Sequence, residues 1–125
     1  MRNISFFLTR DQILARIKRV TRRVGWSHAI PGMMLQPIYK GQGLKAGESV
    51  ERLGCPIIVK DNRPERLTEL IRRPTYGEEE AALEGFPEWS GRQFVDFLCK
   101  QPGVYPEREL NRILFDYAPQ KSPGG

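Results

Sequence analysis

A short run of cations with one hydroxyl and one indole ring carries the clearest chemical signal in this sequence of 125 residues. Lys18, Thr21 and Arg23 follow a Lys-x-x-Thr-x-Arg spacing. Arg22 stands between the last two of them, and Trp26 closes the run. Such a cluster can hold a phosphate while the ring stacks on a base. It can also lower the pKa of the lysine, so that the amine activates the threonine hydroxyl as a nucleophile. A solvated basic helix end followed by an ordinary strand gives the same pattern without any site.

Two adjacent elements are expected to position this run. Thr9 and Gln12 fit a capping box, which predicts a helix that begins at Thr9 and ends near Arg19. Lys18 then lies in the last helical turn, from which its amine can bend back toward the following residues. In the strand that follows, the threonine and the second arginine of Lys-x-x-Thr-x-Arg point to one face. The junction therefore gathers an amine, a hydroxyl and a guanidinium in a small volume.

The rest of the chain predicts an α+β fold. Helices are expected to begin at Pro64 and Ser90, with a short acidic helix at 78–83. About six short apolar segments bounded by turn residues predict strands, at 4–8, 20–24, 33–40, 49–53, 56–60 and 110–117. This pattern favours a small β-barrel with two or three helices over its openings. The middle of the chain lacks the regular strand–helix alternation of a parallel α/β sheet.

Composition indicates one globular domain. Hydrophobic residues make up 39% and charged residues 28% of the chain, and the net charge of +5 favours polyanionic partners. We expect the domain at residues 1–117 and a disordered tail at 118–125, which holds no large apolar residue. No apolar run approaches the ~20 residues of a membrane span. We therefore expect a cytoplasmic protein without a membrane partner.

Metal and disulfide chemistry are not indicated by the sequence. Cys55 and Cys99 lie far apart without a Cys-x-x-Cys motif, and His28 is the single histidine. These residues do not make a zinc constellation. We expect no metal, no cofactor and reduced thiols.

With the Lys-x-x-Thr-x-Arg junction placed between a capped helix and a strand, the chain resembles the ASCH domain family. These are small β-barrels related to PUA RNA-binding domains. The likeness spans Phe6 to Tyr117 and includes Gly-Leu-Lys-Ala-Gly-Glu at 43–48 and Glu84-Gly-Phe-Pro before a Ser-capped helix. In the motif usually written for this family, Gly-x-Lys-x-x-Glu-x-Arg, the lysine and arginine match. Arg16 stands at the Gly position, and a threonine stands at the Glu position.

With this threonine, the motif resembles that of one branch of the family, the N(4)-acetylcytidine amidohydrolases. This branch similarly has Lys-x-x-Thr-x-Arg and uses a lysine, a threonine and a later glutamate. The resemblance implies catalytic roles for Lys18, Thr21 and Glu84, in a PUA-like barrel that acts on a modified cytidine nucleoside or base. Other glutamates close to the third position are Glu78, Glu79, Glu80 and Glu88.

The predicted function is thus removal of the acyl group from N(4)-acylated cytidine or cytosine. Thr21 is the expected nucleophile, Lys18 its base, and Arg23, Trp26 and Arg22 the expected substrate-binding residues. An RNA- or modified-nucleotide-binding module without catalysis stays open as an alternative, because specific RNA readers stack bases on aromatic rings. A ribonuclease stays open too, although a single histidine offers no paired acid and base. The oligomeric state, and whether free nucleoside or RNA is the substrate, do not follow from the sequence.

Overall fold

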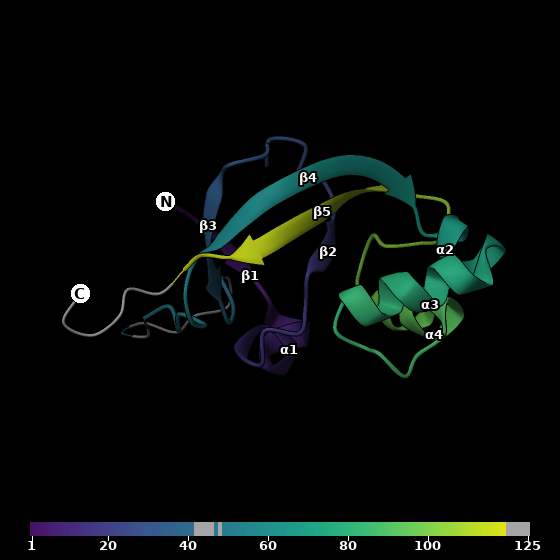
Figure 1. Ribbon diagram of the computed structural model, residues 1–125, viewed down its shortest axis with the longest axis horizontal. Coiled ribbons are helices and arrows are strands. Elements are labelled where there is room, and N and C mark those ends of the chain that lie inside the picture. Colours follow the sequence, from purple (N-terminus) through teal and green to yellow (C-terminus); the bar gives the residue numbers. More distant parts are fainter. Residues whose placement is uncertain (42–46, 48, 120–125) are drawn as a thin grey trace.

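One mixed β-sheet organises the molecule (Figure 1). Its strands are β1 (Arg2–Ser5), β2 (Val20–Arg23), β3 (Met34–Ile38), β4 (Ile57–Arg66) and β5 (Glu109–Tyr117). The computed structural model describes residues 1–41, 47 and 49–119, and within them these five strands pair in the order β1-β3-β4-β5-β2. The pair β1–β3 is parallel, and the other neighbours are antiparallel.

Helices lie in two places relative to this sheet. The described part of the chain holds a 3-10 turn η1 (Phe7–Thr9) and four α-helices: α1 (Arg10–Leu14), α2 (Thr68–Arg72), α3 (Pro74–Leu83) and α4 (Gly91–Leu98). Figure 1 shows α1 near β1 and β2, whereas α2, α3 and α4 form a group beyond one end of the β4–β5 pair. None of the helices in the described ranges combines the length and the hydrophobicity that crossing a membrane requires.

The α+β class predicted from the sequence is confirmed, but a closed barrel of about six strands is not found among the described residues. Strands β1 and β2 are the two edges of an open sheet. The strand predicted at 49–53 is reduced to one bridge, between Arg52 and Ile38. Opposite this segment, the Pro37 carbonyl accepts from the Leu53 N–H at 2.9 Å. Proline has no N–H to donate in return, so a regular ladder cannot continue there.

Two predictions fall wholly or largely outside the described residues. The Gly-Leu-Lys-Ala-Gly-Glu segment at 43–48 lies outside them except for Gly47. Of the tail predicted from residue 118, Ala118 is buried and donates its N–H to the Pro56 carbonyl at 2.8 Å. Residues 120–125 are outside the described part.

The helix predicted from Thr9 to Arg19 is wrong in its length. It begins as the 3-10 turn, and the Thr9 side chain makes no capping hydrogen bond. It ends at Leu14, five residues early, because Arg16 adopts the left-handed conformation with φ 59°. Lys18 therefore lies in the irregular segment between α1 and β2 and not on a helical turn.

The end of α1 has the hydrogen bonds of a Schellman motif, in which a left-handed residue follows the helix. The Arg16 N–H donates to the Ile13 carbonyl at 3.0 Å, and the Ile17 N–H donates to the Gln12 carbonyl at 3.1 Å. Glycine usually occupies the left-handed position, because a Cβ atom there costs about 1–2 kcal/mol. No glycine stands at this position, so the helix end could not be recognised from the residues.

The start predicted for the next helix, at Pro64, is also wrong, because β4 continues through this residue to Arg66 and α2 begins at Thr68. Pro64 lies opposite Asn111 of β5, and Glu65 lies opposite Leu110. β3 pairs only with the first two residues of β4, so the other side of the strand at Pro64 has no β3 partner. A proline is tolerated at such an edge position. The next proline, Pro74, begins α3 directly after α2 has ended at Arg72.

The second predicted capping box is confirmed at the start of α4. Ser90 Oγ accepts from the Gln93 N–H at 3.1 Å, and Gln93 Oε1 accepts from the Ser90 N–H at 2.8 Å. These two bonds satisfy N–H groups that a helix start leaves without a partner.

Two hydrophobic clusters form the core of the described residues. The first lies on the sheet and includes Phe6, Leu35 and Phe115. The second joins α2, α3 and α4 to the start of β5. In it, α2 and α3 approach so closely that a Cβ atom on Gly77 would lie 2.2 Å from the Leu70 carbonyl oxygen. This close packing fixes the position of α3, so that the C-terminal end of the helix lies next to β2.

Candidate functional site

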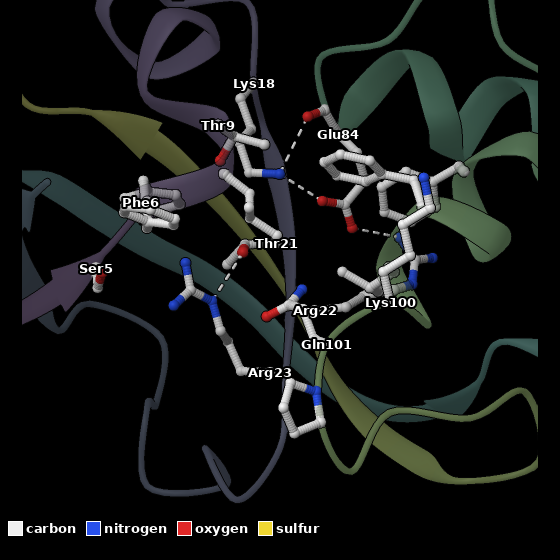
Figure 2. A pocket seen from close by; sticks show the side chains of 16 residues that line it. Ser5, Phe6, Thr9, Lys18, Thr21, Arg22, Arg23, Glu84, Lys100 and Gln101 are labelled. Atoms are coloured by element: carbon white, nitrogen blue, oxygen red, sulfur yellow. Dashed lines mark hydrogen bonds and ion pairs between the residues drawn. The ribbon is translucent and has the colours of Figure 1, made fainter. Parts of the chain in front are cut away.

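A cavity of about 420 Å³ lies between the β1–α1–β2 segment and the ends of α3 and α4 (Figure 2). Lys18, Thr21 and Glu84 all line it, and so do Arg22 and Arg23. Aromatic rings from both sides complete the walls, including Phe6 beside the sheet and Phe94 and Phe97 on α4. The volume falls in the range of about 300–1,000 Å³ that is typical of small-molecule sites.

The Lys18 amine and the Glu84 carboxylate face one another at the centre of this site (Figure 2). Lys18 Nζ lies 2.5 Å from Glu84 Oε1 and 3.0 Å from the Glu84 backbone oxygen. Their side chains are 3% and 2% exposed. The pair is therefore held in a water-poor environment, where an ion pair interacts more strongly than at the surface.

The Glu84-Gly-Phe-Pro turn explains why this carboxylate is placed so firmly. Glu84 is the C-cap of α3, and Gly85 follows with φ +103°. The Gly85 N–H donates to Ala82 at 3.0 Å and the Phe86 N–H donates to Ala81 at 2.9 Å, which completes a Schellman motif. The Arg19 N–H also binds the end of the helix, donating to the Leu83 carbonyl at 2.7 Å. The helix end is thus tied to the chain just before β2.

Thr21 and Arg23 share one face of β2, as their strand alternation predicts. Arg23 Nε donates to Thr21 Oγ1 at 3.0 Å, so the hydroxyl hydrogen of Thr21 stays available for a base. The guanidinium of Arg23 lies 4.7 Å from the centre of the Phe6 ring, which fixes its plane. Burial lowers the pKa of Arg23 to about 10, against the opposing effect of the Glu84 charge. The group is still a cation at neutral pH.

Lys18 is the titratable group whose protonation matters most for chemistry here. Burial lowers its pKa below the ordinary 10.5, and the charges of Arg23 and Arg22 lower it further. The charge and hydrogen bond of Glu84 act in the opposite direction, but burial is the largest of these effects. The neutral amine is therefore more populated near pH 7 than in a free lysine.

Arg22 occupies a different environment from its neighbours. Its side chain is 0% exposed, and it binds glutamates from two elements. Nη1 lies 2.8 Å from Glu84 Oε2, and Nη2 lies 2.6 Å from Glu65 Oε1 and 2.5 Å from Glu80 Oε1. Burial alone would lower the pKa of Arg22, but these three carboxylates raise it above its ordinary value. Arg22 is a permanent cation, and it binds the carboxylate oxygen of Glu84 that Lys18 does not bind.

Two residues of this network, Glu65 and Arg112, were not predicted as site residues from the sequence, and Glu80 was named only as an alternative to Glu84. Glu80 Oε1 accepts from Arg112 Nε at 2.5 Å, and Arg112 is the direct cross-strand partner of Arg22. Two arginines facing each other in a buried region need a carboxylate between them, and only the β2–β5 register reveals this pair. Glu80 stands one helical turn before Glu84, which was the available signal.

The five candidate glutamates separate by burial. Glu84 lines the cavity and Glu80 is buried behind it. Glu78, Glu79 and Glu88 are exposed and do not line the cavity.

Trp26 does not line the cavity. Its ring packs against the sheet cluster, and the Arg2 guanidinium lies 5.1 Å from the ring centre. The Trp26 backbone N–H donates to Asn111 Oδ1 at 2.8 Å. Base stacking on Trp26 would therefore take place outside the pocket that holds Lys18 and Thr21.

Three cations between positions 18 and 22 are paired with acids, whereas Arg23 binds the Thr21 hydroxyl. Lys18 and Arg22 bind glutamates, and Arg19 binds Asp116. Such pairing reduces the positive field that a phosphate backbone would meet. Within the described ranges, no group of three or more His, Cys, Asp or Glu side chains is arranged to hold a metal ion.

Comparison of the chain with protein-family models, with curated proteins and with solved structures found no match.

Proposed function

We propose that this protein is an amidohydrolase that removes the acyl group from N(4)-acylcytidine or the corresponding base. One observation supports this above all others: a buried lysine, bound to a buried glutamate, lines the same small-molecule cavity as a threonine whose hydroxyl hydrogen is free. Nucleophilic amide cleavage requires a nucleophile, a base and a cation near the developing oxyanion. Thr21, Lys18 and Arg23 are suited to these three roles.

The resemblance to the ASCH family gains support from a backbone feature. Arg16 stands where the family motif has glycine, and it is the one non-glycine residue with positive φ in the described ranges. A glycine at this place in the family would serve the same helix end. We infer that the chain is an ASCH-type protein and that its sheet is the PUA-like barrel of that family, open between β1 and β2.

Proton transfer in the proposed reaction begins at Lys18. A free lysine with a pKa near 10.4 is neutral in only about 1 of ~2,500 molecules at pH 7, and each unit by which the pKa falls raises that share tenfold. The neutral amine has two N–H bonds and one lone pair. The two N–H bonds match the two Glu84 oxygens that Lys18 contacts, which leaves the lone pair to take the Thr21 proton, directly or through one water.

Bond making and breaking then follow in two stages. Thr21 Oγ attacks the acyl carbonyl carbon, and Arg23 stabilises the oxyanion. The intermediate expels the cytosine N4 amine, which takes its proton from the Lys18 ammonium, and the acyl group remains as an ester on Thr21. Water hydrolyses this ester with Lys18 again as the base. The net reaction converts N(4)-acylcytidine and water to cytidine and a carboxylic acid.

RNA phosphate binding by the cation run is the weaker alternative, because Lys18, Arg19 and Arg22 are all paired with acids.

The deciding experiment is incubation of the protein with N(4)-acetylcytidine, followed by mass spectrometry for cytidine and acetate. We expect both products from the parent and from Thr75→Ala, which changes an exposed threonine outside the cavity. We expect neither from Thr21→Ala. Absence of cytidine with the folded parent protein would contradict the proposal, and a parallel incubation with an acetylated oligoribonucleotide separates a nucleoside enzyme from an RNA enzyme.

A further inference from the structure

Behind the Lys18–Glu84 pair lies a buried ionic network that the proposed reaction does not use directly. Its centre is Arg22, which donates to Glu84, Glu65 and Glu80 over 2.5–2.8 Å. Arg112 binds Glu80 from the neighbouring strand, and half-exposed Arg63 binds Glu65 at 3.2 Å.

The charges of this network balance without the lysine. Three arginines (Arg22, Arg63 and Arg112) face three glutamates (Glu65, Glu80 and Glu84). Lys18 binds Glu84 as well, and the other carboxylate oxygen of Glu84 is bound to Arg22. A protonated Lys18 adds a further positive charge beside a largely buried set of groups whose own charges already balance, and the Arg23 cation acts on it in the same direction as Arg22.

The two oxygens of Glu84 thus have different partners. Oε1 accepts from Lys18 and Oε2 accepts from Arg22. Because Arg22 shares the carboxylate charge, Glu84 attracts the extra proton of Lys18 less strongly than an unshared carboxylate would. Because two other glutamates hold the Arg22 guanidinium from behind, it cannot turn away from Glu84.

We propose that Arg22 is a positioning residue that holds Glu84 in the site and, by sharing its charge, frees Lys18 to lose a proton. This inference rests on the proposed function for its catalytic meaning, but the effect on Lys18 is a property of the folded protein. Arg22 donates to no atom of Thr21, so it acts through Glu84 and Lys18 and not on the nucleophile.

The groups that face the Lys18 amine are few. Glu84 comes from the end of α3, and Arg22 and Arg23 come from β2. Lys100 stands after α4 on the cavity wall. From β5, the Tyr117 hydroxyl donates to the Lys18 backbone oxygen at 2.7 Å and does not bind the amine. Of the two arginines, only Arg22 binds the glutamate that Lys18 binds.

The test is an NMR titration of protein labelled with ¹³C at the lysine Cε, which reports the protonation of Lys18 without any substrate. The Lys18 signal is assigned by its loss in Lys18→Arg. In the parent we expect a midpoint below 10.5, and in Arg22→Met we expect it to rise by about one pH unit, since one opposing charge is lost and Glu84 is no longer shared. Arg22→Lys keeps a cation and should return the midpoint part of the way. Arg63→Met removes a cation that does not touch Glu84 and should leave it unchanged.

Arg22→Met leaves three buried carboxylates with one fewer partner, so the double variant Arg22→Met with Glu80→Gln is measured beside it. The double variant removes one cation and one anion together, and Glu84 still loses its second partner, so the Lys18 midpoint should rise in it as well. An unchanged midpoint in either folded variant, or an equal rise in Arg63→Met, would overturn the inference. Acetate release is measured on the same samples. If the midpoint shifts as expected but the parent releases no acetate, the proposed function fails while the charge-sharing role of Arg22 stands.

Discussion

Replacing Glu84 by glutamine gives the sharpest stability test of the buried pair. The change keeps the side-chain volume but removes the charge that faces Lys18, whose side chain is 3% exposed. Arg22 keeps two other carboxylates, Glu65 and Glu80, whereas Lys18 keeps only the Glu84 backbone oxygen at 3.0 Å. Breaking one partner out of a buried pair costs about 3–5 kcal/mol. We expect the lower end of this range, about 3 kcal/mol, because the amide oxygen of glutamine still accepts one hydrogen bond.

The deficit of Glu84→Gln should depend on pH in a defined direction. Burial already lowers the pKa of Lys18 below 10.5, and loss of Glu84 removes the interactions that oppose this shift. Between the lowered pKa and 10.5 the unfolded chain binds more protons than the folded one, so stability rises with pH. This window is wider in the variant than in the parent. The deficit should therefore be largest near neutral pH and shrink as the pH approaches 10.5.

Urea denaturation of parent and variant at about pH 7 and about pH 9.5 measures both effects. A loss of about 3 kcal/mol corresponds to a fall in Tm of roughly 10 °C for a domain of this size. Glu69→Gln, which removes a partly exposed glutamate paired with the exposed Arg72, serves as the control and should leave the transition unchanged. Lys18→Met combined with Glu84→Gln should recover most of the loss, because no unpaired lysine charge is left. A deficit that is equal at both pH values, or a double variant as unstable as Glu84→Gln, would refute the reasoning.

Three further outcomes are expected. Gly77→Ala should destabilise the protein by about 3 kcal/mol, because its Cβ would lie 2.2 Å from the Leu70 backbone oxygen, whereas Gly41→Ala meets only a side-chain atom at 3.4 Å and should be tolerated in the same urea assay. Arg16→Gly should raise stability by up to about 1 kcal/mol, since it relieves a left-handed residue at a small entropic cost; an unchanged or lower Tm would contradict this. In the parent, kcat/KM for N(4)-acetylcytidine should rise with pH through a pKa below 10.5, and Lys18→Arg should lose the activity, because a guanidinium does not give up its proton; turnover by Lys18→Arg at the parent rate would show that Lys18 is not the base.

Local sequence patterns were sufficient for those parts of the site that lie close together in the chain. Strand alternation placed Thr21 and Arg23 on one face, and their hydrogen bond spans two residues. The Ser90 capping box was equally local and was correct. The helix end at Arg16 was missed because a residue other than glycine holds the left-handed conformation. The proline at position 64 was misassigned because only the β3–β4 register shows that this end of β4 has no strand on its second side.

The ionic network could not be predicted in the same way. Arg22 binds Glu65, Glu80 and Glu84 at sequence separations of 43, 58 and 62 residues. In the sequence alone, several glutamates are equally good partners for Arg22. Only the packing of α3 against β2 selects among them. For the same reason, Arg22 looked like a substrate-binding cation in the sequence, although its guanidinium is enclosed by carboxylates in the structure.

The central claim is that Thr21 is the nucleophile of an amide hydrolase, and trapping of the acyl group tests it most directly. The protein is mixed with N(4)-acetylcytidine carrying an isotopically labelled acetyl group, quenched in acid at short times, and mapped by peptide mass spectrometry. We predict a labelled acetyl ester on Thr21 in the parent, no label in Thr21→Ala, and labelled acetate released only by the parent. Release of labelled acetate by Thr21→Ala at the parent rate would contradict the account and assign the chemistry to an activated water.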